Sequence, residues 1–512
     1  MPSLRTFTST AALAACLVLA SAAPGQAPAP GGSEPVAGPW LREGERLLDR
    51  EDPVGAWQAF RRAIPGVPGQ IGLGKTHLML GRSDFALAYG EAALRATRDD
   101  QEAMALCVRA LIRGRSFDEA LQRATRFVER VDQPVAELLA ARGSALFRVQ
   151  HIDEAAEVYR QVVARDPQHA EAHLRLGSGL LPPIRLAPEP RLAAAVARAH
   201  AGDREAAIAT LLAVLAAFPD HPVAHRLLGE TLFAARAADS MASADPTFAA
   251  LAAAMPHRDL RAVPTARFVV GYAELAAERR AVVDRTATLF GSRFDRLIGL
   301  GCRHDLLGEL ERTTDATQRS NLRGTRTFDG RVWDDVRGIG GMQAATGIES
   351  LDEAAQFGFD TLVHEIAHQV HFFAFSRVEQ ARLRSLYQAA VSNRTFLDYY
   401  AASNEAEYFG QGVEAFASLG KRPGGETTHG HTRFELLAVD PALHAFIASV
   451  VDYDPLADPA AREPLLVAAI GVALRCGRPA DALVAAGLLP DGPTRQRWLS
   501  EAQCAAAAAT SH

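Results

Sequence analysis

The sequence predicts a mainly α-helical chain in three parts: an N-terminal α-solenoid of helical hairpins, a mixed α+β domain and a short helical C-terminal tail. A repeat with a period near 34 residues runs through residues 40–235 and predicts the solenoid. A strongly amphipathic helix at residues 357–375 carries an HExxH motif and marks the second domain, placed at residues 265–455. Apolar residues at helical spacing in residues 464–504 predict a helical pair in the tail, residues 456–512.

The composition argues against two classes of protein. The 512 residues are 48% hydrophobic and 22% charged, with a formal net charge of −6, and this is too apolar for a disordered chain. The acidic balance also argues against nucleic-acid binding, which normally needs a basic surface. After the N-terminal segment no stretch approaches the roughly twenty apolar residues of a membrane-spanning helix, so we expect no transmembrane segment.

Residues 1–23 have the pattern of a signal peptide. Arg5 is the only charge, a short apolar run covers Ala11 to Ala22, and Ala20-Ser21-Ala22 supplies small residues at the cleavage positions. The protein is therefore expected to be exported, either to the periplasm or outside the cell.

A second interpretation of the N-terminus remains open. Leu13-Ala14-Ala15-Cys16 resembles the lipobox of bacterial lipoproteins, which would anchor the chain through a lipid on Cys16. The segment before it is only weakly apolar, so ordinary cleavage is favoured. Residues 24–39, rich in Pro, Gly and Ala, are expected to be a flexible spacer.

The repeat is clearest in one complete copy. Gly143, Ala155, Tyr159 and Pro167 lie at offsets 0, 12, 16 and 24, and Gly177 follows at offset 34. Other copies match in part: Gly44, Ala56, Phe60 and Pro68; Gly74 and Ala86; Ala120 and Phe127; Ala207, Leu211, Pro219 and Gly229. These residues resemble the tetratricopeptide repeat, with small residues where two helices cross and Pro ending the second helix.

The resemblance implies a curved solenoid of stacked helical hairpins. Its concave surface could hold a peptide or protein partner. It could instead be a structural platform that only supports the next domain, and the sequence leaves both interpretations open.

His364 and His368 are the candidate metal ligands of the amphipathic helix. Their spacing stacks the two imidazoles one turn apart, so that both can reach one Zn²⁺ ion. Glu365 lies beside that face, where its carboxylate could take a proton from water. The helix is defined by apolar residues at three- and four-residue spacing: Phe359, Leu362, Val363, Ile366, Val370 and Phe373.

A catalytic zinc site needs a third protein ligand. His371 lies on the same helix, and three ligands from one straight helix cannot surround a metal. A better candidate is expected on a second helix that Asn404 can cap. From the residues alone the ligand could be Glu405, Glu407 or Glu414.

The second motif carries a resemblance to a known family. HExxH followed by Tyr400-x₆-Glu407, inside Asn404-Glu405-Ala406-Glu407-Tyr408-Phe409, resembles the gluzincin metallopeptidases related to the protease domain of anthrax lethal factor. The resemblance covers roughly residues 325–455 and implies a zincin-like metallopeptidase domain.

The resemblance also implies a role for each matching residue. His364, His368 and Glu407 would bind one catalytic zinc ion. Glu365 would be the general base, and Tyr400 would donate a hydrogen bond to the developing oxyanion or leaving group.

The sequence departs from the family pattern after Glu407. Where those enzymes continue Ala-Glu-Ala-Phe, this chain reads Gly410-Gln411-Gly412-Val413 and reaches Glu414-Ala415-Phe416 three residues later. The departure concerns the carboxylate that would support a zinc ligand, and not the ligand set.

Upstream of the HExxH helix, residues 325–333 alternate around Asp329-Gly330, which predicts a two-residue hairpin turn. The glycine-rich segment 337–341 follows. It could be a strand edge that pairs with an extended substrate, or only a turn.

Two further segments carry no functional prediction. Residues 236–264 are expected to be a linker between the solenoid and the second domain. His429 and His431 flank Gly430 and are expected to be ordinary loop residues.

The sequence as a whole predicts an exported zinc-dependent metallopeptidase that hydrolyses peptide bonds of a protein or peptide substrate. The alternative is a tetratricopeptide-repeat binding scaffold whose zincin domain is zinc-stabilised but catalytically degenerate.

Overall fold

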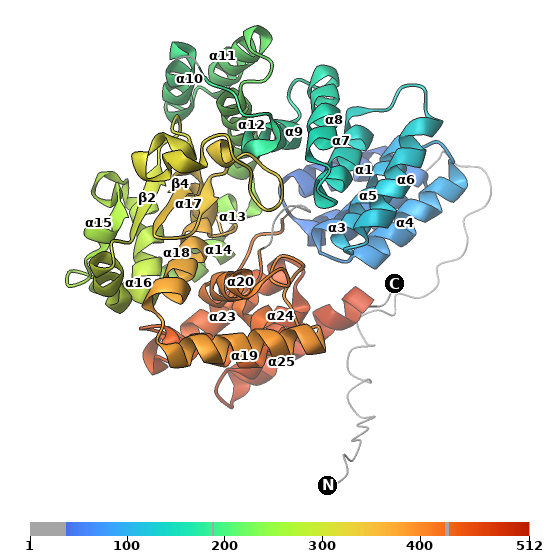
Figure 1. Ribbon diagram of the computed structural model, residues 1–512. Helices are drawn as coiled ribbons and strands as arrows, with labels where there is room; N and C mark the ends of the chain where they lie inside the picture. Colours follow the sequence, from blue (N-terminus) through green and yellow to red (C-terminus); the bar gives the residue numbers. More distant parts are fainter. Residues whose placement is uncertain (1–36, 187–188, 425–429, 511–512) are drawn as a thin grey trace.

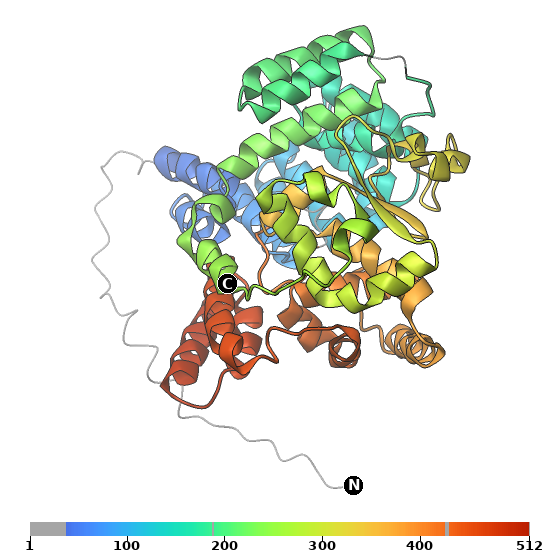
Figure 2. The same cartoon turned by 90° about the vertical axis from the view of Figure 1, so that its left-hand side faces the viewer.

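The computed structural model describes residues 37–186, 189–424 and 430–510. The solenoid leads into a central domain and then a helical tail, and Figures 1 and 2 show the three parts packed against one another. The predicted signal peptide, Cys16, His429 and all but the last three residues of the predicted spacer lie outside the described residues. Across the described ranges, no helix is long and apolar enough to cross a membrane.

Four antiparallel helical pairs begin the solenoid, as the repeat predicts. A Cβ atom on Gly143 would lie 3.0 Å from the ring of Tyr159, and one on Gly44 would lie 2.5 Å from the ring of Phe60. In both pairs the aromatic side chain fills the space that the glycine leaves. The helices are α1 (Ala37–Asp49), α2 (Pro53–Arg61), α3 (Val67–Met79), α4 (Ser83–Ala96), α5 (Gln101–Arg113), α6 (Phe117–Arg130), α7 (Ala136–Arg148) and α8 (Ile152–Arg165).

The array of hairpins is interrupted after α8. Helix α9 (Ala170–Arg175) continues as the π-helical segment η2 (Leu176–Leu180), which bends at Gly179 with φ +90°. The chain then forms α10 (Pro190–His200), α11 (Arg204–Ala217) and α12 (Pro222–Ala238). Gly177 lies so close to α12 that a Cβ atom would be 2.4 Å from the Arg226 backbone nitrogen. This small residue therefore joins η2 to α12, and not to the helix next in sequence.

The central domain contains a four-stranded sheet with the order β1-β2-β4-β3. Strands β1 (Val269–Val270), β2 (Arg303–Leu307) and β4 (Gln343–Gly347) are parallel, and β3 (Gly338–Ile339) pairs antiparallel with β4 at the edge. An edge strand thus lies within the glycine-rich segment. The helical segments are α15 (Thr265–Phe268), η3 (Tyr272–Glu274), α16 (Ala277–Gly299), η4 (Thr313–Asp315), η5 (Thr317–Leu322), η6 (Trp333–Asp335), α17 (Glu349–Ala355), α18 (Thr361–Gln369), η7 (Val370–Ala374), α19 (Arg377–Asn393), α20 (Glu405–Ala417), α21 (Arg433–Val439) and α22 (Pro441–Val450).

The predicted hairpin at residues 325–333 is present, with Arg326 opposite Val332, but its turn has three residues and not two. Thr327 N donates to the Arg331 carbonyl across the turn (2.8 Å). Beyond the turn, Val332 N donates to the carbonyl of Gly179 in the solenoid (2.7 Å). The pairing continues past the turn, since Trp333 N donates to the Thr325 carbonyl (3.0 Å), and the outward-facing Val332 N attaches the hairpin to η2.

Residues 236–264, predicted to be a linker, contain α13 (Met241–Ala244) and α14 (Pro246–Ala254). The segment is helical because Phe248 and Leu251 are buried in one apolar core with the tail. The tail has three helices, α23 (Pro459–Arg475), α24 (Pro479–Gly487) and α25 (Pro493–Thr510), where the sequence predicted a pair. Arg475 pairs with Asp52 of the first repeat (3.1 Å), so the tail also contacts the start of the solenoid.

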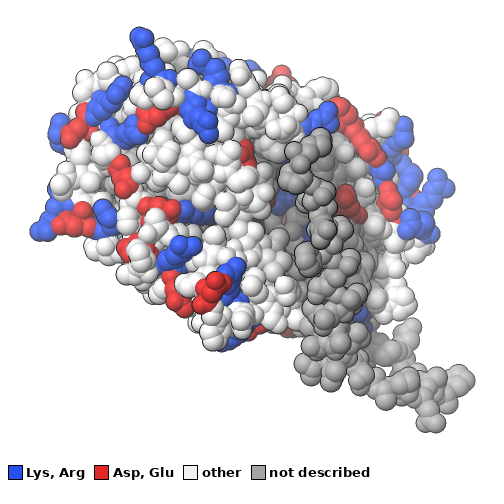
Figure 3. Space-filling model, turned by 90° about the horizontal axis from the view of Figure 1, so that it is seen from below, with Lys and Arg blue, Asp and Glu red and all other residues white. Residues whose placement is uncertain are grey.

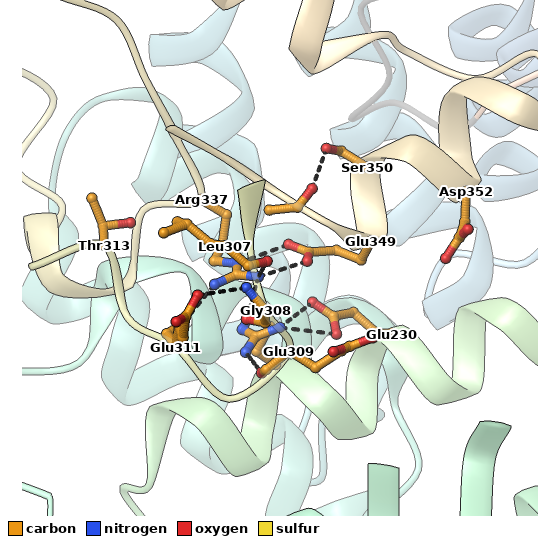
Figure 4. Close-up of polar contacts among 12 residues, drawn as sticks. Glu230, Leu307, Gly308, Glu309, Glu311, Thr313, Arg337, Glu349, Ser350 and Asp352 are labelled. Carbon is orange, nitrogen blue, oxygen red and sulfur yellow. Dashed lines mark hydrogen bonds and ion pairs between the residues drawn. The ribbon is translucent and has the colours of Figure 1, made fainter. Parts of the chain in front are cut away.

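A buried polar cluster joins α12 of the solenoid to the sheet (Figure 4). Arg226 pairs with Glu230 one turn later (2.8 Å), and Arg337, just before β3, pairs with Glu349 of α17 (2.7 Å). Burial and the nearby charge of Glu349 raise the pKa of Glu230 to about 7, against the opposing effect of Arg226. Arg337 also donates to the carbonyl of Leu307 (3.1 Å), so the same cluster fixes the loop that follows β2.

The close contact at Gly177 gives a test of this arrangement. We expect Gly177→Ala to lower the free energy of unfolding by about 1–3 kcal/mol, because the added methyl group meets backbone atoms that cannot move aside. Gly299→Ala is the matched control, since a Cβ atom there has nothing within 4 Å, and we expect it to be neutral or slightly stabilising. Urea unfolding of both variants measures the difference, and equal stabilities would contradict the packing described.

Candidate metal centre

Helix α18 presents the HExxH residues from the core of the central domain. The Asp360 side chain caps the helix by accepting a hydrogen bond from Val363 N (3.1 Å). Ile366 is fully buried in the apolar core and anchors the opposite face. His364 and His368 are buried as well, and both imidazoles point toward α20.

His364, His368 and Glu407 bring three ligand atoms to one point. His364 Nε2 lies 3.0 Å from His368 Nε2 and 3.1 Å from Glu407 Oε2, and the distance from His368 Nε2 to that oxygen is 3.5 Å. Tetrahedral ligands about 2 Å from a zinc ion lie roughly 3.3 Å apart, so these spacings and this donor set fit zinc. In the described part of the chain, this is the one group of His, Cys, Asp and Glu side chains that meets the geometry of a metal site.

The geometry distinguishes the three glutamates that the sequence left open. Glu407 accepts hydrogen bonds from both histidines, and these lower its pKa to about 2 although burial opposes ionisation. Glu405 instead pairs with His371 (3.2 Å), outside the ligand group. Glu414 pairs with Lys421 and accepts a hydrogen bond from Asp360 N (3.0 Å).

Helix α20 can approach the histidines because it has a glycine at the crossing. A Cβ atom on Gly410 would lie 2.8 Å from His364 Cε1 and 2.9 Å from His368 Cε1. Asn404 caps the helix by accepting hydrogen bonds from the backbone of Ala406 and Glu407, both at 3.0 Å. The departure from the family pattern at residue 410 is thus a packing requirement of this chain.

The second departure leaves polar atoms without a hydrogen-bond partner. Gln411 stands where the family pattern has a glutamate, and within the described ranges both atoms of its buried amide are unpartnered. The Nδ1 atoms of His364 and His368 are likewise buried and unpartnered there. No carboxylate among the described residues therefore supports the histidines through Nδ1.

Glu365 lies between the candidate metal ligands and the edge strand. Burial raises its pKa to about 7, with Glu407 adding to the effect and His368 opposing it. A Cβ atom on Gly338 of β3 would lie 2.8 Å from Glu365 Oε1, and one on Gly340 would lie 3.3 Å from Glu365 Oε2. The glycines are needed because the strand passes directly over this carboxylate.

Tyr400 reaches the site from the loop between α19 and α20. Its ring centroid lies 6.4 Å from that of His364, and burial raises its pKa far above the usual value. The loop is held by Asp398, which accepts a hydrogen bond from Ala401 N (2.7 Å) and pairs with His431 (3.2 Å). All five predicted site residues therefore lie within one region.

The solenoid also contacts this loop. Arg148 at the end of α7 donates to the Tyr399 hydroxyl, and its guanidinium lies 5.0 Å from the centroid of that ring. Phe117 of α6 packs against Tyr399 edge-on (5.4 Å). Arg115 donates to the Leu397 carbonyl (3.2 Å). Side chains of two repeats thus hold the residues that precede Tyr400.

Sequence reasoning missed Arg331, Arg148 and His431 as parts of this region. Arg331 follows the turn in the 325–333 loop, and its charge lowers the pKa of both Glu365 and Tyr400. Its place depends on the attachment of that loop to the solenoid. No local pattern indicates a contact between segments so far apart in the sequence.

Zinc retention separates the ligands from their neighbours. We expect His364→Ala, His368→Ala and Glu407→Ala each to weaken zinc binding by more than the roughly 10–100-fold typical of losing an outer-shell partner. Glu405→Ala is the matched control on the same helix and should keep the metal, because its carboxylate pairs with His371. Metal analysis of the purified proteins after dialysis tests this, and zinc loss in Glu405→Ala with retention in Glu407→Ala would refute the assignment.

The His431 contact gives a pH dependence. Burial alone would lower the pKa of His431, but the carboxylates of Glu435 and Asp398 raise this pKa to about 9. The stabilisation of the fold by protonated His431 and its two carboxylate partners is therefore complete below pH 6.5. It declines between pH 6.5 and 9 and is lost above pH 9. We expect His431→Gln to lower the free energy of unfolding by on the order of 1–3 kcal/mol at pH 6 and by little above pH 9.

Urea unfolding between pH 6 and 9.5 measures this difference. His151→Gln is the control, because His151 is an exposed histidine of the solenoid. A His431→Gln effect that stays constant across this range would contradict the ion pairs.

The comparisons with known proteins concern the repeats. Residues 136–178 match the tetratricopeptide repeat family, and no curated protein matches the chain. Among solved structures, TTC0263, a thermophilic tetratricopeptide-repeat protein of Thermus thermophilus, is 19% identical over 38% of this chain and 99% of its own (TM-score 0.27). YrrB, a repeat protein described as having an unusual peptide-binding site, is 22% identical over 37% of this chain and 89% of its own (TM-score 0.22). MamA AMB-1 C2221 is 14% identical over 33% of this chain and 92% of its own (TM-score 0.21). The family match thus covers residues 136–178, the part of the solenoid that holds the most complete copy of the repeat.

Proposed function

We propose that this protein is an exported zinc-dependent metallopeptidase with a gluzincin-type central domain. The observation that carries the proposal is the convergence of His364, His368 and Glu407 beside Glu365 and beneath an edge strand. Export rests on the signal-peptide pattern of residues 1–23.

Each side chain of the site has a defined task in peptide hydrolysis. Zinc held by the three ligands would supply a Lewis acid that polarises the scissile carbonyl and increases the acidity of water. Glu365 takes the proton of the attacking water and passes it to the leaving amine. Tyr400 donates a hydrogen bond to the carbonyl oxygen as negative charge develops, a contribution worth about 2–4 kcal/mol.

The edge strand β3 provides a way to hold the substrate. An extended peptide can add a strand to a sheet edge through backbone hydrogen bonds. Because Gly338 and Gly340 bring this strand against Glu365 and His368, a peptide paired to β3 lies next to the general base. This geometry favours an extended polypeptide as the substrate.

The second candidate function is a binding scaffold. The family match at residues 136–178 supports the repeats and does not reach the central domain. In this alternative the solenoid binds a peptide or protein partner, and the central domain binds zinc without turnover. Zinc content alone cannot distinguish the two functions, whereas peptide hydrolysis can.

Two conservative substitutions separate chemistry from metal binding. Glu365→Gln keeps the shape but cannot accept a proton, so we expect full zinc occupancy with hydrolysis lowered about 10²–10⁴-fold. Tyr400→Phe should also keep zinc and lower turnover about 10²–10³-fold. Hydrolysis of a mixed peptide library with the zinc-loaded proteins measures both effects.

The matched controls are Glu405→Gln, since Glu405 pairs with His371, and Tyr453→Phe, since the Tyr453 hydroxyl donates to Asp458 (3.1 Å) and not to the site. Both should hydrolyse the library at close to the wild-type rate. A wild-type protein that binds zinc but cleaves no peptide would favour the scaffold. Wild-type rates in Glu365→Gln would exclude the mechanism.

A further inference from the structure

A cavity of about 690 Å³ lies where the solenoid, the central domain and the tail meet. Its volume is within the range of ordinary ligand sites. Seven of its lining side chains are Arg or Lys and three are acidic, although the whole chain has a net charge of −6. The basic residues are Arg82, Arg113, Arg115, Arg148, Lys421, Arg422 and Arg478.

The repeat explains why four arginines share one wall. Arg82 lies just before α4, Arg113 ends α5, Arg115 lies in the turn between α5 and α6, and Arg148 ends α7. These are equivalent ends of consecutive hairpins, which a solenoid stacks along one edge. Lys421 and Arg478 line the same cavity from the central domain and the tail. A row of positive charge thus extends over three repeats.

The acidic residues of the cavity already have cationic partners. His431 pairs with Asp398 (3.2 Å) and with Glu435 (3.0 Å). Arg478 lies 3.5 Å from Asp481. The three carboxylates are therefore engaged, and so are two of the seven basic residues, Arg478 and Lys421, which pairs with Glu414.

Arg82 is the clearest candidate for binding an anion. Its side chain is half-buried, and burial lowers its pKa with no charged group offsetting the effect. In residues 37–186, 189–424 and 430–510, no hydrogen bond or ion pair reaches its guanidinium. Arg115 donates to the Leu397 carbonyl and keeps further N–H groups for a ligand.

We propose that this cavity binds an acidic segment of a polypeptide, with Arg82 and Arg115 taking its carboxylates. A single small anion would contact one turn, whereas the charge extends along three. On the face drawn in Figure 3, basic and acidic side chains are interspersed, so the one-sided charge of the cavity is a local feature. The proposal is independent of peptide hydrolysis, and its test requires no turnover.

Fluorescence anisotropy with a labelled hexaglutamate peptide and the mature full chain provides the test. We expect saturable binding that weakens with salt, and no binding of labelled hexaglutamine. The double variant Arg82→Gln/Arg115→Gln should bind hexaglutamate at least 10-fold more weakly. Arg95→Gln/Arg126→Gln removes the same charge from exposed solenoid positions outside the cavity and should change binding less than 2-fold.

Thermal unfolding of each variant checks that the fold is kept. Arg82→Gln alone, which breaks no hydrogen bond or ion pair among the described residues, should still weaken binding about 3-fold. No binding to the wild type, or equal loss in both double variants, would overturn the proposal. Displacement of the peptide by citrate at the same concentration as by unlabelled hexaglutamate would show a small-anion site and would also overturn it.

Discussion

The candidate metal centre depends on how closely α18 and α20 can cross, because its three candidate ligands come from both helices. A side chain at Gly410 would collide with both imidazoles and would hold the Glu407 carboxylate away from them. The crossing is fixed again further along α20, where Glu414 accepts a hydrogen bond from the backbone at the start of α18. With both ends of the contact fixed, the distances between the three ligand atoms are set by backbone packing rather than by flexible side chains.

The solenoid is attached to the central domain mainly by polar contacts. The buried apolar clusters described for the solenoid contain only solenoid residues. The attachments are instead the Arg148–Tyr399 hydrogen bond, the backbone bond from Val332 to Gly179 and the cluster around Arg226. Hydrogen bonds have a preferred direction, so such a junction fixes orientation in a way that apolar packing does not. Orientation matters here because the loop beside Tyr399 carries Tyr400.

Local pattern predicted the parts of the site that lie on one helix or one strand. The spacing of His364 and His368 and the cap at Asn404 are periodic or neighbouring signals, and the structure places both as expected. The choice of Glu407 over Glu405 and Glu414 came from a family resemblance, since all three lie on one helix. The helical linker and the interrupted solenoid were not predicted, because they depend on contacts between distant segments, such as Gly177 with Arg226.

The sequence leaves two roles open for the solenoid, a structural platform and a binding surface. The cavity between the solenoid, the central domain and the tail relates the two roles. Leu397, Asp398 and Tyr399 line that cavity and directly precede Tyr400. A ligand held by the arginines of the repeat turns therefore contacts the same loop that Arg148 holds. If such a ligand favours one position of the loop, it raises the affinity of the candidate zinc site for molecules that need that position. Because coupling between two sites is reciprocal, those molecules raise the affinity of the cavity for its ligand by the same factor. The proposed ligand site of the solenoid and the candidate metal centre then share one loop.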